Sequence, residues 1–305
     1  MLVLAMNSQS AILSAPAGMN RAALLLVFAA GLLAAGATAA NGEECLDCHG
    51  DAVPASPFAA SAHAEFGCAG CHTDIEGFPH PSKAAPPDCA TCHDQVVAAY
   101  RQSIHGQARG SGTLEAPNCF SCHGDVHALV PHTDSASPVH PSRLPETCGS
   151  CHANPELVAK FNIPFARPLA AYRASVHARA VAQGRDGATC SDCHGSHAIF
   201  AAADPRSPVY HSRVPETCGT CHNQIAAAYK NSIHGIAVAH GARQAPVCTD
   251  CHGEHRILSP KEPGSPVFST NIPLLTCGRC HGDIRLTERY GLPLDKVPAY
   301  EDSYH

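Results

Sequence analysis

The feature that most constrains this chain is a short motif that uses every cysteine. All 18 cysteines fall into Cys-x-x-Cys pairs, and a histidine follows each pair directly, so the motif occurs nine times. We number the copies motif 1 to motif 9 in chain order. The cysteines are Cys45 and Cys48, Cys68 and Cys71, Cys89 and Cys92, Cys119 and Cys122, Cys148 and Cys151, Cys190 and Cys193, Cys218 and Cys221, Cys248 and Cys251, and Cys277 and Cys280. The histidines that end the motifs, called proximal below, are His49, His72, His93, His123, His152, His194, His222, His252 and His281.

Cys-x-x-Cys-His is the attachment motif of c-type haem. Two thiols one helical turn apart reach the two vinyl groups of one porphyrin, and the imidazole that follows binds the iron from one face. The sequence therefore predicts nine covalently bound c-type haems, each held by two cysteines and one proximal histidine.

Three other interpretations compete with haem attachment. An exported Cys-rich chain can be a disulfide scaffold, but disulfides do not require a histidine after every second cysteine. Zinc sites also use Cys-x-x-Cys, yet they combine two such elements and place no fixed histidine at that step. A chance match explains one copy, and it does not explain nine copies that use all 18 cysteines.

The composition indicates that the polypeptide alone cannot fill its own interior. The 305 residues include no Trp, 5% aromatic residues, 24 Gly and 25 Pro. A chain so short of bulky apolar side chains needs another source of core material. We expect a mostly irregular chain with short α-helices and little β-structure, arranged as an elongated array in which the haems form the core. A protein of this kind should not fold without its haems.

Charge gives little indication of a polyanionic partner. The formal net charge is −6, and no block of Lys or Arg occurs. Nothing in the sequence therefore points to nucleic acid or to an anionic membrane surface.

The N-terminal segment has the features of an export signal. Residues 19–40 contain a basic start at Arg21, an apolar run and a small-residue cleavage pattern at Ala37, Thr38 and Ala39. We predict that residues 1–39 form a cleaved signal peptide and that the mature protein is periplasmic, at the cell surface or extracellular. An uncleaved membrane anchor is the alternative, although an apolar run of about 15 residues is short for a membrane span.

The identity of the second iron ligand decides what such haems can do. A sixth ligand favours an electron carrier, whereas an open position permits substrate chemistry. Methionine is excluded by position, because the only three are Met1, Met6 and Met19. The 22 histidines exceed the nine proximal ones by 13, so histidine is the expected second ligand.

A second repeated element supplies five candidate ligands. The segments FAASAH, YRQSIH, YRASVH, YKNSIH and YEDSYH share the pattern aromatic-x-x-Ser-x-His, and we call them Ser-x-His elements. Their histidines are His63, His105, His177, His234 and His305. Because an aromatic residue and a serine three apart share a helix face, we expect a short helix that packs its ring on a porphyrin and offers its histidine to an iron. A surface histidine on a loop is the alternative.

Four more candidates follow a motif closely. His127, His197 and His255 follow motifs 4, 6 and 8, and His80 occupies a looser version of this place in the first repeat. His197 and His255 lie three residues after a proximal histidine, and three extended residues span at most about 10 Å. The Cα atoms on opposite sides of one bis-histidine iron should be about 13 Å apart. These two histidines must therefore bind the iron of a neighbouring motif.

Motifs and candidate ligands then alternate along the chain, nine of each. The histidines left over are His132, His140, His211 and His240, which we interpret as surface residues or partners of haem propionates. His80 is the weakest candidate, and His132 or His240 could replace a ligand. The sequence does not determine which distal histidine serves which motif.

The same alternation divides the chain into repeats. We expect residues 41–97 to carry haems 1–3, residues 98–169 haems 4 and 5, residues 170–226 haems 6 and 7, and residues 227–305 haems 8 and 9 with a terminal ligand element. The best internal match pairs SPVHPSRLPETCGSCH (137–152) with SPVYHSRVPETCGTCH (207–222).

In these residues the chain resembles the multihaem c-type cytochromes with doubled Cys-x-x-Cys-His motifs, the cytochrome c3-type family. The resemblance runs over CHTDIEGFPHP, the SIHG steps, the CHG-x-H steps and ETCG-x-CH. It implies closely packed bis-His haems of low potential that carry electrons in anaerobic or extracellular respiration. It also implies redox-protein partners, such as a quinol-oxidising membrane complex or other cytochromes. Some relatives form filaments in which a histidine of one subunit binds a haem of the next, so head-to-tail assembly through His305 stays open.

Two function classes remain open on the sequence. An electron-transfer protein follows if nine candidate ligands saturate nine irons, and it has no catalytic residue. A multihaem oxidoreductase acting on a nitrogen or sulfur oxyanion follows if one iron keeps an open position. The offset ends of the ligand series, with His305 following the last motif, add the possibility of a filament subunit.

Overall fold

The structure is a computed structural model that describes residues 43–75, 77, 80, 85–164 and 167–303. The expected signal peptide, residues 1–39, and the candidate ligand His305 lie outside the described residues. All nine motifs and the other candidate ligands lie within them.

The described chain is built from short helices. The α-helices are α2 (Glu43–His49), α3 (Ala55–Ala59), α4 (Ala90–Gln102), α5 (Ile104–Gly110), α6 (Cys119–His123), α7 (Leu144–His152), α8 (Pro155–Lys160), α9 (Pro168–Arg173), α10 (Val176–Ala182), α11 (Cys190–His194), α12 (Val214–Gly219), α13 (Asn223–Lys230), α14 (Ile233–Ala239), α15 (Cys248–His252), α16 (Gly278–His281), α17 (Ile284–Tyr290) and α18 (Lys296–Glu301). The 3₁₀-helices are η1 (Ala64–Phe66), η2 (Val126–Ala128) and η3 (His211–Arg213), and η4 (Ile272–Cys277) is a π-helix. The described residues contain no strand. The expected fold class of short helices with little β-structure is confirmed.

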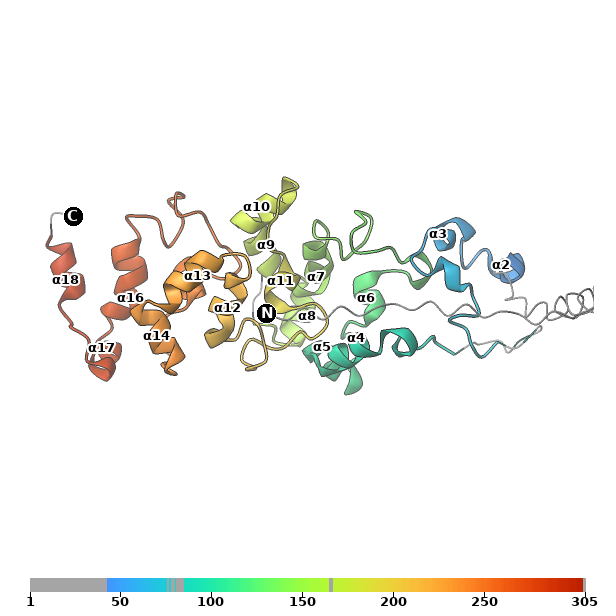
Figure 1. Cartoon of the computed structure of the whole chain (residues 1–305), viewed down its shortest axis with the longest axis horizontal. Helices are drawn as coiled ribbons and strands as arrows, with labels where there is room; N and C mark the ends of the chain where they lie inside the picture. The colour runs from blue at the N-terminus through green and yellow to red at the C-terminus, as the bar shows by residue number, and fades with distance from the viewer. Residues whose placement is uncertain (1–42, 76, 78–79, 81–84, 165–166, 304–305) are drawn as a thin grey trace, which may run out of the picture.

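The helices follow one another along a long, narrow molecule. In Figure 1 the elements run nearly in chain order from α2 at one end to α16, α17 and α18 at the other. Most contacts join elements that are close in sequence, such as α4 with α5 and α12 with α13. This is the contact pattern of a repeat protein, in which each unit packs on its neighbours.

Most motifs form a helical turn that ends at the proximal histidine. Helices α6, α11 and α15 begin at the first cysteine of motifs 4, 6 and 8 and end at the histidine. Gly124, Gly195 and Gly253 follow directly with φ of 87°, 81° and 81°, a conformation that favours glycine and stops a helix. Motifs 2, 3 and 7 differ: residues 68–71 form turns, α4 continues past His93, and α12 ends at Gly219, before His222.

The Ser-x-His elements are not single helices, which corrects the sequence expectation. In YRQSIH, α4 ends at Gln102, Ser103 is extended with ψ of 160°, and α5 starts at Ile104. Ser103 is the N-cap of α5, and its hydroxyl accepts the Gly106 N–H at 3.0 Å. Serine is a preferred N-cap residue because it satisfies a helix donor that has no partner in the helix. The histidine therefore lies in the first turn of a new helix.

Steric crowding explains why a glycine follows two of these histidines. A Cβ at Gly106 would overlap the carbonyl oxygen of Tyr100, and a Cβ at Gly235 would overlap that of Tyr229. The SIHG step therefore lets the second helix fold back closely on the end of the first.

The polypeptide provides very little core of its own. The buried apolar residues of the described chain are Ala116, Ala180, Val214, Ala226, Val247 and Leu258. Larger side chains such as Phe66, Ile225 and Leu275 are more than half exposed. Such a small core cannot offset the entropy of ordering a chain of this length, so the fold requires another apolar component.

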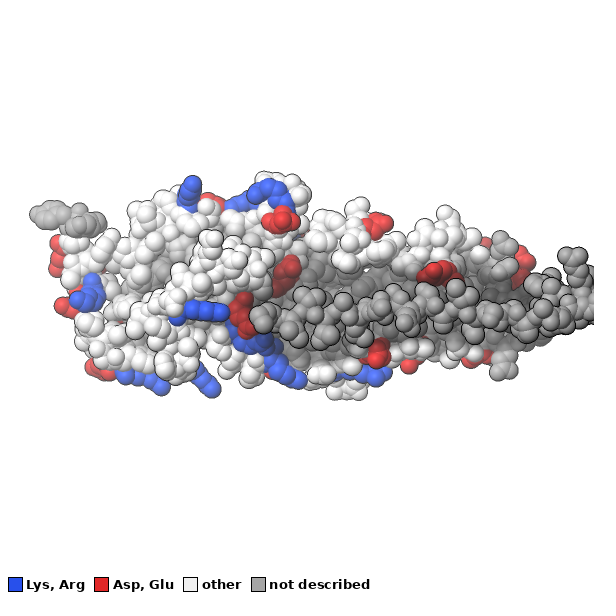
Figure 2. All heavy atoms as spheres, viewed as in Figure 1, with Lys and Arg blue, Asp and Glu red and all other residues white. Residues whose placement is uncertain are grey.

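The surface view shows no large patch of one charge. In Figure 2 acidic and basic side chains are mixed along the visible face, with wide uncharged areas between them. Among the described residues, no helix combines the length and apolar character that crossing a bilayer requires.

Candidate functional site

Eight of the nine proximal histidines each face a second imidazole. The distances between ring centroids are 5.7 Å for His49–His80, 6.4 Å for His72–His127, 6.0 Å for His93–His63, 6.0 Å for His123–His197, 6.1 Å for His152–His105, 6.0 Å for His194–His255, 6.2 Å for His222–His177 and 6.2 Å for His281–His234. Every second ring belongs to a histidine that the sequence marks as a candidate ligand.

These separations fit two imidazoles on opposite faces of one iron. With a metal–nitrogen distance of about 2.0 Å on each side, and roughly 1.1 Å from that nitrogen to the ring centre, the centroids should lie about 6.2 Å apart. In each pair, the proximal histidine directly follows the two cysteines of its motif. The residues present therefore fit a covalently attached haem with two axial histidines.

The Ser-x-His elements reach forward along the chain. His63 follows motif 1 and pairs with motif 3, and His105 follows motif 3 and pairs with motif 5. His177 and His234 repeat this step to motifs 7 and 9. Each of these histidines therefore pairs with the second motif after it.

The segments that follow motifs 4, 6 and 8 reach backward. We call residues 124–129, 195–199 and 253–257 the post-motif segments. Their histidines His127, His197 and His255 pair with motifs 2, 4 and 6. Each pairs with the second motif before its own. Forward and backward steps together interlock every stretch of three motifs.

The first and eighth motifs depart from this register. His49 of motif 1 pairs with His80, the weakest candidate on sequence, and the ring planes differ by 25°. In the part of the chain that the structure describes, no ring pairs with His252 of motif 8. Among the ring pairs of the described residues, none joins His132, His140, His211 or His240 to a proximal histidine.

The two kinds of distal histidine differ in ring orientation. In the pairs made by the post-motif segments, the ring planes differ by 21°, 5° and 11°. In the pairs made by the Ser-x-His elements, the angles are 43°, 63°, 42° and 44°. Motifs 2, 4 and 6 thus have nearly parallel imidazoles, and motifs 3, 5, 7 and 9 have tilted ones.

A main-chain hydrogen bond joins the two kinds of element three times. The N–H of the residue before the distal histidine donates from Ala62, Ile104 and Val176. The acceptors are the carbonyls of Leu129, Ile199 and Ile257, at 2.7, 2.8 and 2.8 Å. Each acceptor lies two residues after the histidine of a post-motif segment and is Leu or Ile.

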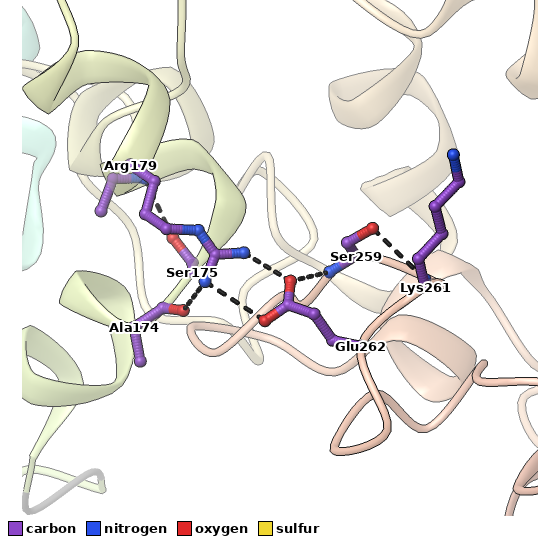
Figure 3. A network of polar contacts seen from close by, with 7 residues as sticks. Ala174, Ser175, Arg179, Ser259, Lys261 and Glu262 are labelled. Atoms are coloured by element: carbon purple, nitrogen blue, oxygen red, sulfur yellow. Dashed lines mark hydrogen bonds and ion pairs between the residues drawn. The ribbon is translucent and has the colours of Figure 1, made fainter.

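A side-chain ion pair strengthens the third junction, and a groove lies beside the second. Figure 3 shows Arg179 of α10 reaching Glu262, which follows the third post-motif segment. Arg179 Nη2 donates to Glu262 Oε1 at 2.5 Å, and the same oxygen accepts the Ser259 N–H. At the second junction a groove of about 460 Å³ lies between Val96 of α4 and residues of the 195–200 segment, including His197.

The tyrosines of the Ser-x-His elements hold the next motif. The hydroxyls of Tyr100, Tyr172 and Tyr229 donate to the carbonyls of Pro117, Ala188 and Pro246, at 2.7, 3.0 and 2.9 Å. Each carbonyl lies two residues before the first cysteine of the following motif. The tyrosine therefore ties a distal ligand to the start of another haem-binding turn, a role that the sequence analysis missed. The constant spacing of 16 or 17 residues between the two groups was the available signal.

Attachment cysteines of neighbouring motifs influence each other. Interaction with Cys190, followed by burial, raises the pKa of the Cys148 thiol, and interaction with Cys248, followed by burial, raises the pKa of the Cys218 thiol. None of the 18 cysteines, all within the described residues, pairs in a disulfide. In both cases the first cysteine of an odd-numbered motif interacts with the first cysteine of the next motif.

Burial favours the form of histidine that binds a metal. Burial, and then the neighbouring His152, lowers the pKa of His105, and burial followed by His255 lowers the pKa of His194. Iron binds neutral imidazole, so these environments hold the side chains in the binding form.

Repeated Cys-x-x-Cys-His turns, eight of them with a second imidazole opposite the proximal one, are typical of multihaem c-type cytochromes. The family model described as cytochrome c7 and related cytochrome c matches residues 34–94, which contain motifs 1 to 3. No curated protein and no solved structure matches the chain. The resemblance to multihaem cytochromes c is therefore supported by an independent comparison, and it implies covalently bound c-type haem and electron transfer.

Proposed function

We propose that this protein is an exported nine-haem cytochrome that carries electrons along a row of closely packed, low-potential haems. The observation that carries the proposal is the set of eight imidazole pairs, with centroids 5.7 to 6.4 Å apart, beside Cys-x-x-Cys motifs. When bound, each haem supplies a one-electron redox centre.

The chain's own residues attach, orient and space these centres. The 18 cysteines would form the thioether bonds, and the nine proximal histidines would each bind one iron. The second ligands at eight irons would be His63, His80, His105, His127, His177, His197, His234 and His255. Two nitrogen ligands at these eight irons would leave no position for a substrate.

Ligand type and spacing support the electron-transfer role. Histidine–methionine ligation raises the potential of a cytochrome, so two histidines favour low values. The electrostatic interactions of Cys148 with Cys190, and of Cys218 with Cys248, support close approach of neighbouring haems. The elongated arrangement of the helices in Figure 1 spreads the motifs along one axis.

The setting of this function is part of the proposal. We propose that the protein works in the periplasm or at the cell surface, in anaerobic or extracellular respiration. Its partners would be redox proteins, namely a quinol-oxidising membrane complex or other cytochromes. The signal-like residues 19–40 support export.

A reductive titration of the purified holoprotein tests the proposal. We expect nine electrons per molecule, low midpoint potentials and ferric and ferrous spectra dominated by low-spin iron. Fewer than nine electrons, or high-spin iron at several haems, would contradict it.

His252 is the observation that favours a second candidate function. Because no ring of the described residues pairs with it, an iron bound there could take a small oxyanion or its reduction product. A multihaem reductase of this kind should consume nitrite, hydroxylamine or sulfite with many turnovers per molecule when supplied with reductant. An electron carrier should show no turnover with any of the three.

A further inference from the structure

In three motifs the residue directly before the second cysteine caps the attachment turn. Its side chain accepts the backbone N–H of the residue before the first cysteine. Asn118 donates to Ser121 Oγ at 3.1 Å in motif 4, Thr189 to Asp192 Oδ2 at 2.7 Å in motif 6, and Val247 to Asp250 Oδ2 at 2.7 Å in motif 8. A neutral hydroxyl therefore makes in motif 4 the interaction that a carboxylate makes in motifs 6 and 8.

The carboxylate of Asp192 is fixed on its turn. Besides the Thr189 N–H, the same oxygen accepts the Thr189 hydroxyl at 2.7 Å. Ser121 and Asp192 are both exposed, so motifs 4 and 6 differ at this position in charge rather than in burial. Because both cysteines of a motif bond to one porphyrin, the residue between them is held close to that haem.

Motif 8 carries the same carboxylate with cationic groups around it. His211 Nε2 lies 3.5 Å from Asp250 Oδ2, and Arg279 Nη2 donates to the Asp250 carbonyl at 2.6 Å. Arg279 occupies in motif 9 the position that Ser150 and Thr220 occupy in motifs 5 and 7. Those two hydroxyls each donate to a carbonyl three residues earlier in the chain. The motif that follows thus brings a guanidinium to the turn of motif 8.

The carboxylate of motif 6 has no such cation. Among the described residues, the ion pairs do not include Asp192. The motif that follows offers Thr220 in place of an arginine. The three turns therefore form a series, uncharged at motif 4, negative at motif 6, and negative with a neighbouring cation at motif 8.

Charge beside a haem changes the free energy of its reduction. Ferric haem carries one more positive charge than ferrous haem, so a nearby carboxylate stabilises the ferric form and lowers the reduction potential. A guanidinium acts in the opposite direction. The series of turns therefore bears directly on the order in which these haems accept electrons.

We propose that Asp192 lowers the reduction potential of the haem at motif 6 below that of the haem at motif 4, and that Arg279 offsets the same effect of Asp250 at motif 8. This inference rests on the proposed haem attachment at every motif. Asp192 sets a potential and takes no part in binding iron. When few electrons are available, they occupy the haems at motifs 4 and 8 before the haem at motif 6.

Coulometric redox titration of the holoprotein and of exchange variants tests the inference. Asp192→Ser gives motif 6 the residue of motif 4, and Ser121→Asp does the reverse. The area under the titration curve gives the sum of the midpoint potentials, which should rise in Asp192→Ser and fall by a similar amount in Ser121→Asp. Arg279→Ser should also lower the sum. Both exchange variants keep a cap acceptor, so their unfolding temperatures should stay close to that of the wild type.

Asp186→Asn is the matched control for Asp192→Asn. Asp186 is exposed, lies four residues before Cys190 and stands outside the attachment turn. Both changes remove one carboxylate and keep the shape of the side chain. Water and salt screen a charge that is not held against the turn, so Asp186→Asn should shift the sum much less than Asp192→Asn.

Four results separate the possible failures. Equal shifts in Asp192→Asn and Asp186→Asn would overturn the inference, because they would show a general effect of net charge. Shifts of the same sign in Asp192→Ser and Ser121→Asp would overturn it by showing a structural disturbance, and an unchanged sum in Arg279→Ser would remove the offset at motif 8. Nine haems with unchanged potentials in both exchange variants would overturn this inference alone, whereas fewer than nine haems in the wild type would overturn the proposed function.

Discussion

Three serines fix the helix turns that carry distal histidines. Ser103, Ser175 and Ser232 accept the backbone N–H three residues on, at 3.0, 3.1 and 3.2 Å. Ser103 and Ser175 are almost completely buried. Since the histidine lies two residues after each serine, the cap determines where the imidazole points.

Removing one cap should destabilise its helix and loosen the ligand. Ser103→Ala should lower the free energy of unfolding by about 1 kcal/mol, the usual cost of losing a serine cap. The change should also increase high-spin iron at motif 5, where His105 pairs with His152. Denaturant titration and ferric absorption spectra measure the two effects.

The control for this prediction separates capping from general loss of a hydroxyl. Ser103→Asp keeps a cap acceptor and should retain most of the stability. Ser111→Ala removes an exposed hydroxyl bonded to the Gln107 carbonyl and should cost less than about 0.5 kcal/mol. Equal losses in Ser103→Ala and Ser111→Ala would contradict the capping role.

Tyr172 should make the protein less stable in alkali. Burial, with Asp192 acting in the same direction, raises the pKa of Tyr172 from 10 toward about 12. Between these values the unfolded chain loses the phenol proton and the folded chain keeps it. Stability is therefore full below pH 10 and falls as the pH rises toward 12.

Denaturation midpoints measured from pH 8 to 11.5 test this dependence. Tyr172→Phe should start less stable, because it loses the bond to the Ala188 carbonyl, and should decline less with pH. Tyr210→Phe, outside the Ser-x-His elements, should follow the wild-type profile. Parallel profiles for wild type and Tyr172→Phe would contradict the assignment.

At the scale of residues, the sequence marks candidate ligands because motif and ligand recur at matched positions, and eight of the nine distal candidates face a proximal ring. Local geometry was harder to predict. The serine was interpreted as part of a helix face, whereas it ends one helix and caps the next. A pattern of six residues does not distinguish a continuous helix from two helices that meet at a cap, since serine is compatible with both.

Two kinds of element produce two kinds of ligand pair. Post-motif segments place rings at 5° to 21° from the proximal ring, and Ser-x-His elements place them at 42° to 63°. The angle between two axial imidazoles sets the splitting of the iron d orbitals. Even-numbered and odd-numbered haems should therefore differ electronically.

Electron paramagnetic resonance of the ferric protein should resolve these groups. We expect rhombic low-spin signals from the nearly parallel pairs and strongly anisotropic low-spin signals from the tilted ones. His197→Ala should remove intensity only from the rhombic group, and His177→Ala only from the anisotropic group. A single uniform low-spin signal would contradict the two-element arrangement.

At the scale of elements, the sequence could not predict which distal histidine pairs with which motif. Alternation of motifs and candidates suggested that neighbours share ligands, and the distance limit ruled out the proximal histidine three residues before His197 and His255. The forward and backward steps of two motifs depend on how distant segments pack. Main-chain hydrogen bonds, such as that from the Ile104 N–H to the Ile199 carbonyl, set that packing. Because backbone groups make these bonds, the sequence alone does not reveal which segments they join.

On the scale of the whole molecule, the polypeptide depends on its cofactor to fold. Only six apolar residues are buried in the described chain, and three of them are alanines. Protein produced without haem attachment should lack a cooperative unfolding transition and should be cut rapidly by protease, because its chain entropy is not offset. Calorimetry and limited proteolysis of haem-free and haem-loaded protein test this. A haem-free chain that melts cooperatively would contradict it.

Overall shape could be predicted in outline and not in detail. Short helices and an elongated array follow from nine motifs spread evenly through a Pro- and Gly-rich chain. The division into units at 41–97, 98–169, 170–226 and 227–305 stays a prediction. Because the ligands cross between these segments, the units depend on one another.

The most direct test of the account is the mass of the intact mature protein under denaturing conditions. Thioether bonds survive denaturation, so the mass should exceed that of the polypeptide by nine haems, with no free thiol left among the 18 cysteines. A smaller haem number, or a mass that matches the polypeptide with disulfides or bound zinc, would contradict the claim that every motif attaches a haem.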